Sequence, residues 1–125
     1  MPDPIDPRIL AGLRIKEYFP IAKAFEALNK TSYELWPDVN YLMMAKSVRA
    51  GIITRVEMND GYLDLTSLAA ALYMERTRCS RMISTWETKG YIERVKIKNS
   101  NYVKGTSKYH VKGKIYLDRM AELFA

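Results

Sequence analysis

Residues 65–94 read LTSLAAALYMERTRCSRMISTWETKGYIER and predict the centre of the fold. Leu68, Ala69 and Leu72 recur at the spacing of one helix face, which indicates a short helix. Thr66 is suited to cap that helix, because its hydroxyl can accept a hydrogen bond from a free amide of the first turn. We therefore expect a short amphipathic helix whose inner face packs on a core.

A second helix is expected after a turn at residues 73–75. The pattern indicates a helix over residues 76–89, and Gly90 is typical of the position just after a helix end. Its apolar residues fall on one face at i, i+3, i+4 and i+7, and they are Cys79, Met82, Ile83 and Trp86. The two helices and the turn together predict a helix-turn-helix.

The second helix carries hydroxyl and guanidinium groups away from its apolar face. These residues are Arg76, Thr77, Arg78, Ser80, Arg81, Ser84, Thr85 and Thr88. An α-helix fits the major groove of DNA, where arginine can bind guanine through two hydrogen bonds and Ser or Thr can reach bases or phosphates. The first helix would cross the DNA backbone and brace the second. An ordinary solvent-exposed polar face is the alternative, and the helix alone does not distinguish the two.

Two segments after Gly90 alternate between basic and apolar residues, which predicts a β-hairpin. Residues 94–98 and 108–112 are the expected strands, and residues 99–107 join them. The residues expected to face the core are Val95, Ile97, Tyr109 and Val111. The basic residues expected on the hairpin are Arg94, Lys96, Lys98, Lys104, Lys108 and Lys112. Such a wing can lie along a DNA groove or backbone, so its presence favours DNA binding over plain exposure of the helix.

The positive charge of the chain lies in its second half. Residues 1–62 carry eight basic and eight acidic side chains, whereas residues 63–125 carry twelve basic and six acidic ones. The formal net charge of +6 therefore comes entirely from the second half. A basic excess concentrated on one motif indicates a polyanionic partner, most simply nucleic acid.

The sequence lacks the motifs of enzymes and metal sites. One cysteine excludes an internal disulfide, and with one histidine it argues against a structural zinc site. There is no glycine-rich phosphate loop, metal-spaced acid pair or nucleophile elbow. We therefore expect no enzymatic activity, no cofactor and no metal. Cys79 is expected to be inert packing rather than a redox sensor, and His110 to be exposed on the wing or to contact a phosphate.

The first half of the chain predicts supporting helices. One helix should start near Pro7 and break or kink near residues 18–19, because Pro20 cannot donate a backbone hydrogen bond. A second apolar stripe covers residues 21–28. Residues 29–32 are expected to form a loop.

Further along the first half, the sequence predicts one more helix and a strand. The helix is expected to start near residues 37–38 and to run past Gly51 to residue 56. Residues 59–61, Asn-Asp-Gly, would terminate it, and residues 62–65 alternate like a short strand. A last amphipathic helix carries Leu117, Met120, Ala121 and Phe124.

Four aromatic residues of the first half could line a small-ligand pocket between the N-terminal helices and the helix-turn-helix. They are Phe25, Tyr33, Trp36 and Tyr41. Packing in the core or in a dimer interface is the alternative for these residues. The sequence does not identify a ligand.

Residues 65–94 resemble the winged-helix core of MarR-type bacterial transcription regulators. The resemblance rests on the LT start, the helix of small residues, the S-R pair and the final E-x-K-G-Y-I-E-R. The segment SKYHVKGKIYLDRM also resembles that family's last wing strand and the helix after it. The resemblance covers residues 62–120 and implies a homodimer on a pseudo-palindromic DNA site, with the second helix in the major groove and the wing at the minor groove. It also implies that a small-molecule effector is possible.

Two features depart from the pattern of that family. The wing tip reads NSNYVKGT and lacks the usual Asp-x-Arg motif, so no specific minor-groove arginine is carried over. The sequence ends at Ala125 with one short helix where the family has a longer dimerisation pair. We therefore expect the helices of residues 8–57 to contribute more of the dimer contact.

The sequence thus predicts one domain, mainly α with a small β wing, of the winged helix-turn-helix class. Residues 8–57 would form the dimerisation helices, residues 62–113 the winged helix-turn-helix and residues 114–125 the final helix. The opening MPDPIDPR and the lack of a long apolar run predict a cytoplasmic protein without a signal peptide or membrane span.

The expected function is that of a transcriptional regulator that binds double-stranded DNA sequence-specifically. A winged helix that docks an acidic protein partner is the alternative. The expected DNA contacts are Thr66, Arg76, Thr77, Arg78, Ser80, Arg81, Ser84, Thr85, Arg94, Lys96, Lys98, Lys104 and Lys108.

Overall fold

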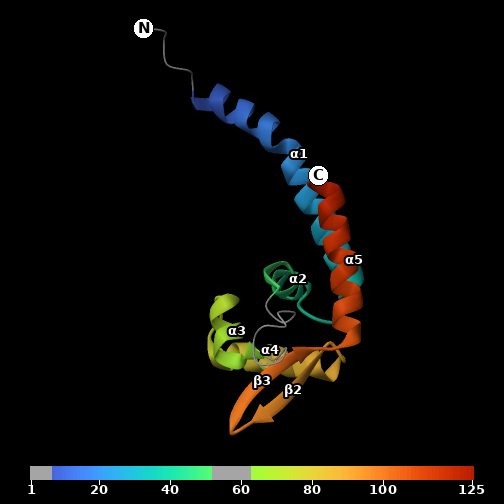
Figure 1. Cartoon of the computed structure of the whole chain (residues 1–125). Helices are drawn as coiled ribbons and strands as arrows, with labels where there is room; N and C mark the ends of the chain where they lie inside the picture. The colour runs from blue at the N-terminus through green and yellow to red at the C-terminus, as the bar shows by residue number, and fades with distance from the viewer. Residues whose placement is uncertain (1–6, 52–62) are drawn as a thin grey trace.

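The computed structural model describes the backbone of residues 7–51 and 63–125, and the side chains of residues 20–51 and 63–125. Its elements are α1 (Pro7–Leu35), α2 (Tyr41–Ala50), β1 (Leu63–Asp64), α3 (Leu65–Ala71), α4 (Arg76–Thr88), β2 (Ile92–Ile97), β3 (Ser100–Gly105) and α5 (Ser107–Leu123). Figure 1 shows α3, α4 and the sheet gathered at one end, with α1 and α5 running away from them side by side. The predicted class, mainly α with a small β wing, is confirmed. None of the described helices is long and apolar enough to cross a membrane.

α1 is a single helix of 29 residues, where the sequence predicts two pieces and a loop. Pro20 lies inside it, so of the break or kink expected near residues 18–19 the break is wrong. Figure 1 shows that the helix bends along its length but continues. A proline removes one hydrogen bond from the helix and commonly bends it, and a long helix retains the bonds on both sides.

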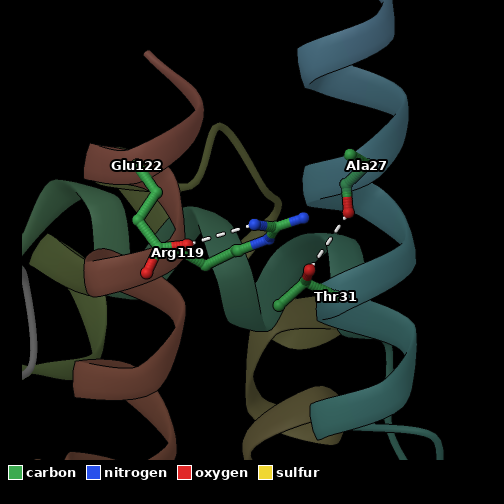
Figure 2. A network of polar contacts seen from close by, with 4 residues as sticks. All are labelled: Ala27, Thr31, Arg119 and Glu122. Atoms are coloured by element: carbon green, nitrogen blue, oxygen red, sulfur yellow. Dashed lines mark hydrogen bonds and ion pairs between the residues drawn. The ribbon is translucent and has the colours of Figure 1, made fainter. Parts of the chain in front are cut away.

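The expected loop at residues 29–32 is also helical. Thr31 donates a hydrogen bond from its hydroxyl to the carbonyl of Ala27 at 3.1 Å, as Figure 2 shows, and Ser32 donates to the carbonyl of Leu28 at 3.0 Å. These bonds satisfy polar groups that otherwise favour turns. Figure 2 also shows α5 facing this part of α1, with Arg119 pointing toward α1 while it bonds Glu122 at 3.1 Å.

α2 is shorter at both ends than the sequence predicts. It begins after Asn40, whose side chain accepts a hydrogen bond from the Met43 amide at 3.2 Å. It ends at Gly51, which has a φ of 61° in the left-handed region that glycine adopts without a steric penalty. The helix therefore does not run past Gly51. The predicted terminator at residues 59–61 lies outside the described residues.

α3 is capped by Asp64 and not by Thr66. The Asp64 carboxylate accepts a hydrogen bond from the Ser67 amide at 2.7 Å. Thr66 instead lies exposed in the first turn of the helix. The sequence prediction assigned Asp64 to a strand, and the residue in fact does both, because it ends β1 and caps α3.

The hairpin is tighter than predicted. β2 and β3 pair antiparallel and are joined by Lys98 and Asn99, with φ values of 48° and 67°. Positive φ at both central residues is the requirement of a type I′ turn, whose twist suits two adjacent strands. The predicted second strand at residues 108–112 is wrong, because these residues lie in α5. Tyr109, Gly113 and Tyr116 are buried along one face of that helix, a helical spacing that overlaps the alternating pattern.

The faces of the hairpin are opposite to those predicted. In the sheet order β1-β3-β2, Arg94 is paired with buried Val103 and lies two residues after buried Ile92. Alternate strand residues share a face, so Arg94 lies on the inner face with Ile92. Val95 is only half-buried and Ile97 is exposed. A one-residue difference in the assumed alternation exchanges the two faces.

One apolar core joins the helices to the sheet. The inner residues predicted for α3 and α4 that are buried are Leu68, Ala69, Leu72, Cys79, Ile83 and Trp86, whereas Met82 is half-buried. Two buried tyrosines of α5 connect this core to α2 through their hydroxyls. Ser47 lies 3.0 Å from the Tyr109 hydroxyl, and Arg49 donates to the Tyr116 hydroxyl at 2.7 Å.

The substitution Asp64→Ala should lower the free energy of unfolding by about 1 kcal/mol, because it removes the cap of α3. Thr66→Ala, two residues away in the same turn, is the matched control and should change stability by less than about 0.5 kcal/mol. Urea denaturation followed by circular dichroism measures both. A larger loss in Thr66→Ala than in Asp64→Ala would contradict the assignment of the cap.

Candidate nucleic-acid interface

The start of α4 is fixed by the turn that the sequence predicts at residues 73–75. Tyr73 has a φ of 54°, and its amide bonds the carbonyl of Ala70 at 3.1 Å. Lys46 of α2 donates to the carbonyl of Leu72 at 3.3 Å and lies 4.6 Å from the centre of the Tyr73 ring. Lys46 therefore ties the end of α3 and the turn to α2.

The predicted polar face of α4 lies at the surface. Arg76, Thr77, Arg78, Arg81, Ser84 and Thr85 are exposed, and Ser80 is half-buried. An open depression of about 440 Å³ lies between this face and the hairpin, lined by Leu65, Arg76, Thr77, Ser80, Arg81 and Asn101. Asn101 was not among the predicted site residues, because residues 99–107 were expected to be a loop. Its position opposite Lys96 in the hairpin places it at this depression.

Three hydroxyl groups of α4 bond to their own helix. Ser84 donates to the carbonyl of Ser80 at 3.1 Å, Thr85 to that of Arg81 at 3.4 Å and Thr88 to that of Ser84 at 2.9 Å. Such bonds occupy the hydroxyl hydrogen and leave the oxygen lone pairs as acceptors. The strong hydrogen-bond donors on this surface are therefore the guanidinium groups.

The predicted cationic face of the wing is only partly formed. Lys96 and Lys98 are exposed on β2 and the turn, and Lys104 is exposed on β3 opposite Glu93. Lys108, Lys112 and His110 lie on α5, so their assignment to a wing strand is wrong. His110 is exposed there, with its ring edge-on to the Tyr109 ring.

Lys108 and Lys112 bind the ends of other helices. The Lys108 ammonium donates to the carbonyl of Lys89, the residue after α4, at 2.9 Å. The Lys112 ammonium donates to the carbonyl of Leu35, the last residue of α1, at 2.6 Å. Cations stabilise the carbonyl end of a helix because the helix dipole is negative there. These two lysines therefore hold α5 against α4 and α1.

Tyr91 lies between these two lysines. Its hydroxyl donates to Asp38 at 2.9 Å and accepts from Lys112 at 3.2 Å, and the Lys108 ammonium is 4.3 Å from the ring centre. Burial and the hydrogen bond to Asp38 raise the pKa of Tyr91 to about 12. Desolvation raises the pKa of Asp38, but the hydrogen bond from Tyr91, a backbone hydrogen bond and the nearby lysines outweigh it and hold that pKa below its ordinary value. The Tyr91 hydroxyl is thus a neutral donor to a carboxylate.

The four aromatic residues considered for a ligand pocket have separate partners. Trp36 is fully buried, with its ring 5.6 Å from that of Tyr116 in the core. Tyr33 packs edge-on against Tyr41 at 5.4 Å. Phe25, inside α1, packs edge-on against Phe124, the residue after α5, with the ring centres 5.0 Å apart. Trp36 thus packs in the core and does not line a pocket. A small-molecule ligand stays a prediction.

Cys79 lies beneath the polar face of α4 and is fully buried. Burial raises the pKa of its thiol, although the nearby Arg94 charge lowers it in part. A buried thiol with a raised pKa has little thiolate to react. This environment fits packing, as the sequence predicts.

Alkylation of Cys79 by iodoacetamide at neutral pH should be slow in the folded protein and fast in denaturant, because only unfolding exposes the thiol and restores its ordinary pKa. Intact mass spectrometry over a time course measures the rate. A free cysteine peptide in the same buffer is the control. Equal rates for the folded protein and the peptide would contradict the buried position.

Solved structures with the same fold cover most of the chain. The YusO protein from Bacillus subtilis covers 94% of this chain and 79% of its own, with a TM-score of 0.71 and 12% identity. A MarR family protein from Bacillus stearothermophilus covers 98% and 81%, with a TM-score of 0.63 and 13% identity. MepR, a transcription regulator of the Staphylococcus aureus multidrug efflux pump MepA, covers 86% and 78%, with a TM-score of 0.61 and 17% identity. No protein-family model and no curated protein sequence matches the chain. At these identities the likeness is one of fold, and the fold is the winged helix found in MarR-type regulators.

Proposed function

We propose that the chain is a transcriptional regulator that binds double-stranded DNA sequence-specifically. α4 is the recognition helix and enters the major groove, and the β2–β3 hairpin is the wing that follows the adjacent backbone. The observation that carries the proposal is the depression between the two, where Arg76, Thr77, Arg81 and Asn101 converge. The fold shared with a solved transcription regulator, MepR, supports the same function.

The exposed groups divide into base contacts and phosphate contacts. We assign base contacts to Thr77 and Arg81, which line the depression, because an arginine fork can bind the guanine edge and a threonine hydroxyl can reach a base. The residues assigned to sugar and phosphate contacts are Thr66, Arg76, Arg78, Lys96, Lys98 and Lys104. Phosphate contacts fix the register on the duplex without reading its sequence.

Arg81→Ala should weaken binding to a duplex selected from a random pool by about 1–3 kcal/mol and should leave binding to random duplex nearly unchanged. Lys98 is the contrasting position. Because its φ is positive, Lys98→Asn removes the charge with less strain in the turn than alanine would cause. This variant should weaken both duplexes equally and reduce the slope of log K against log salt by about 1.

Fluorescence anisotropy at several salt concentrations measures these effects. Equal losses on selected and random duplexes for both variants would contradict the division into base and phosphate contacts. If the unchanged protein shows no salt-dependent binding to any duplex, DNA binding is excluded and an acidic protein partner becomes the better assignment for the basic face.

We also infer that two copies pair through α1 and α5. Phe25 and Phe124 contact each other where the two helices meet, yet they are 53% and 42% exposed, and Ile21 lies exposed one turn earlier. Adjoining exposed apolar side chains of this kind mark protein interfaces. α5 has 17 residues and can contribute to this contact beside the helices of the first half.

Phe25→Asp should therefore convert a dimer into a monomer, because it places a charge among apolar side chains in the interface. Sedimentation velocity measures the mass, with Tyr33→Asp, an exposed aromatic on the same helix, as the control. The monomeric variant should also lose affinity for a duplex with two half-sites more than for a duplex with one. An unchanged mass for Phe25→Asp would exclude this interface.

A further inference from the structure

We propose that Arg94 is a positioning residue that fixes the wing to the recognition helix and does not itself contact DNA. The inference rests on the proposed function, because its consequence is the specificity of DNA binding. It also assigns Ser80 and Ser84 to a structural contact, although both lie among the polar residues of α4. The sequence alone suggests a DNA contact for all three.

The contact joins one residue of β2 to two turns of α4. The terminal nitrogen Nη2 of Arg94 donates to the carbonyl of Ser80, and it lies 3.3 Å from the Ser80 hydroxyl and 2.9 Å from the Ser84 hydroxyl. The backbone amide of Arg94 donates to the Glu87 carboxylate at 3.1 Å. Main chain and side chain of Arg94 therefore both bind α4.

The position of Arg94 opposes a direct contact with phosphate. It lies on the inner face of the hairpin, opposite Val103, and its Nε is buried with no hydrogen-bond partner among the described residues. The Nη2 donors are directed at α4. Turning the guanidinium outward would break these bonds and leave Ser80 without its cationic partner, at a cost that a phosphate contact would first have to offset.

Ser84 is engaged in both of its hydrogen-bonding roles. Its hydroxyl donates to the carbonyl of Ser80 at 3.1 Å and accepts from Arg94. A hydroxyl has one hydrogen to donate, so Ser84 cannot also donate to a base while this network exists. Ser80 and Ser84 thus supply the acceptors for the Arg94 guanidinium.

The contact fixes the part of the wing that carries exposed polar groups toward DNA. Lys96 follows Arg94 by two residues on the same strand and is paired with Asn101. Asn101 shares the depression with Thr77 and Arg81 of α4. If the wing is free to tilt, Asn101 and Lys96 lose their fixed distance from the base-reading residues. Loss of Arg94 should therefore reduce discrimination between sequences more than it reduces overall affinity.

The test compares Arg94→Lys with Arg94→Gln on selected and random duplexes. Lysine keeps the charge but not the planar fork, and glutamine keeps a donor but not the charge. Both variants should lower the ratio of the two affinities by about tenfold while random-duplex binding and its salt slope stay close to the unchanged protein. Lys96→Gln, an exposed cation on the same strand, is the control and should weaken both duplexes alike.

A second measurement needs no DNA. The melting-temperature losses of Arg94→Gln and Ser84→Ala should not add in the double variant, because both remove the same contact. Additive losses would overturn the contact.

One outcome of the binding test would overturn the positioning role and show a phosphate contact. In it, Arg94→Lys keeps the full ratio of selected to random duplex affinity, and Arg94→Gln loses affinity equally for both duplexes. If the unchanged protein binds no duplex, the proposed function and the effect on specificity fall together, whereas a non-additive melting cycle would still support the contact between wing and helix.

Discussion

The buried Tyr91 and its hydrogen bonds connect the helix-turn-helix to the rest of the fold. Its amide bonds the carbonyl of Trp86, and its own carbonyl accepts from the amide and the hydroxyl of Thr106 at 2.9 and 3.0 Å. Its hydroxyl reaches Asp38 and Lys112. One residue therefore links α4, the end of β3, the loop after α1 and α5. Because Gly90 has a φ of 81°, the chain can turn there and bury Tyr91 directly after α4.

The two helices of the motif could be predicted from sequence because their burial follows helical periodicity. Leu72, Ile83 and Trp86 are buried as expected, and the polar residues of α4 are therefore placed correctly. The ends of elements could not be predicted in the same way. Asp64 caps α3 while it also belongs to a strand, and Pro20 lies within α1, where the rest of a long helix and its packing against α5 outweigh one lost hydrogen bond.

The sequence predicted a β-hairpin after Gly90 but not which of its residues face the core. The set of candidate site residues changed as a result. The alternation from residue 94 onward omits Ile92, which is the residue of β2 that enters the core. With Ile92 inward, Arg94 also faces α4. Asn101, which the sequence did not assign to the site, lines the depression beside α4. The segment around Tyr109 fits both an alternating and a helical pattern, and burial of Tyr109 and Tyr116 together selects the helix.

The positions of Lys108 and Lys112 distinguish two effects of positive charge, the long-range attraction of a polyanion and direct contact with it. A net charge counted from composition does not distinguish them. Both ammonium groups donate to carbonyls at the ends of helices, so a phosphate could bind them only by displacing those carbonyls. They still add to the positive potential at a distance, which accelerates the approach of a polyanion. They do not add to the ions displaced once it is bound. For the proposed DNA complex, encounter kinetics should follow the total charge, whereas the salt dependence of equilibrium binding should follow only the cations that reach the duplex.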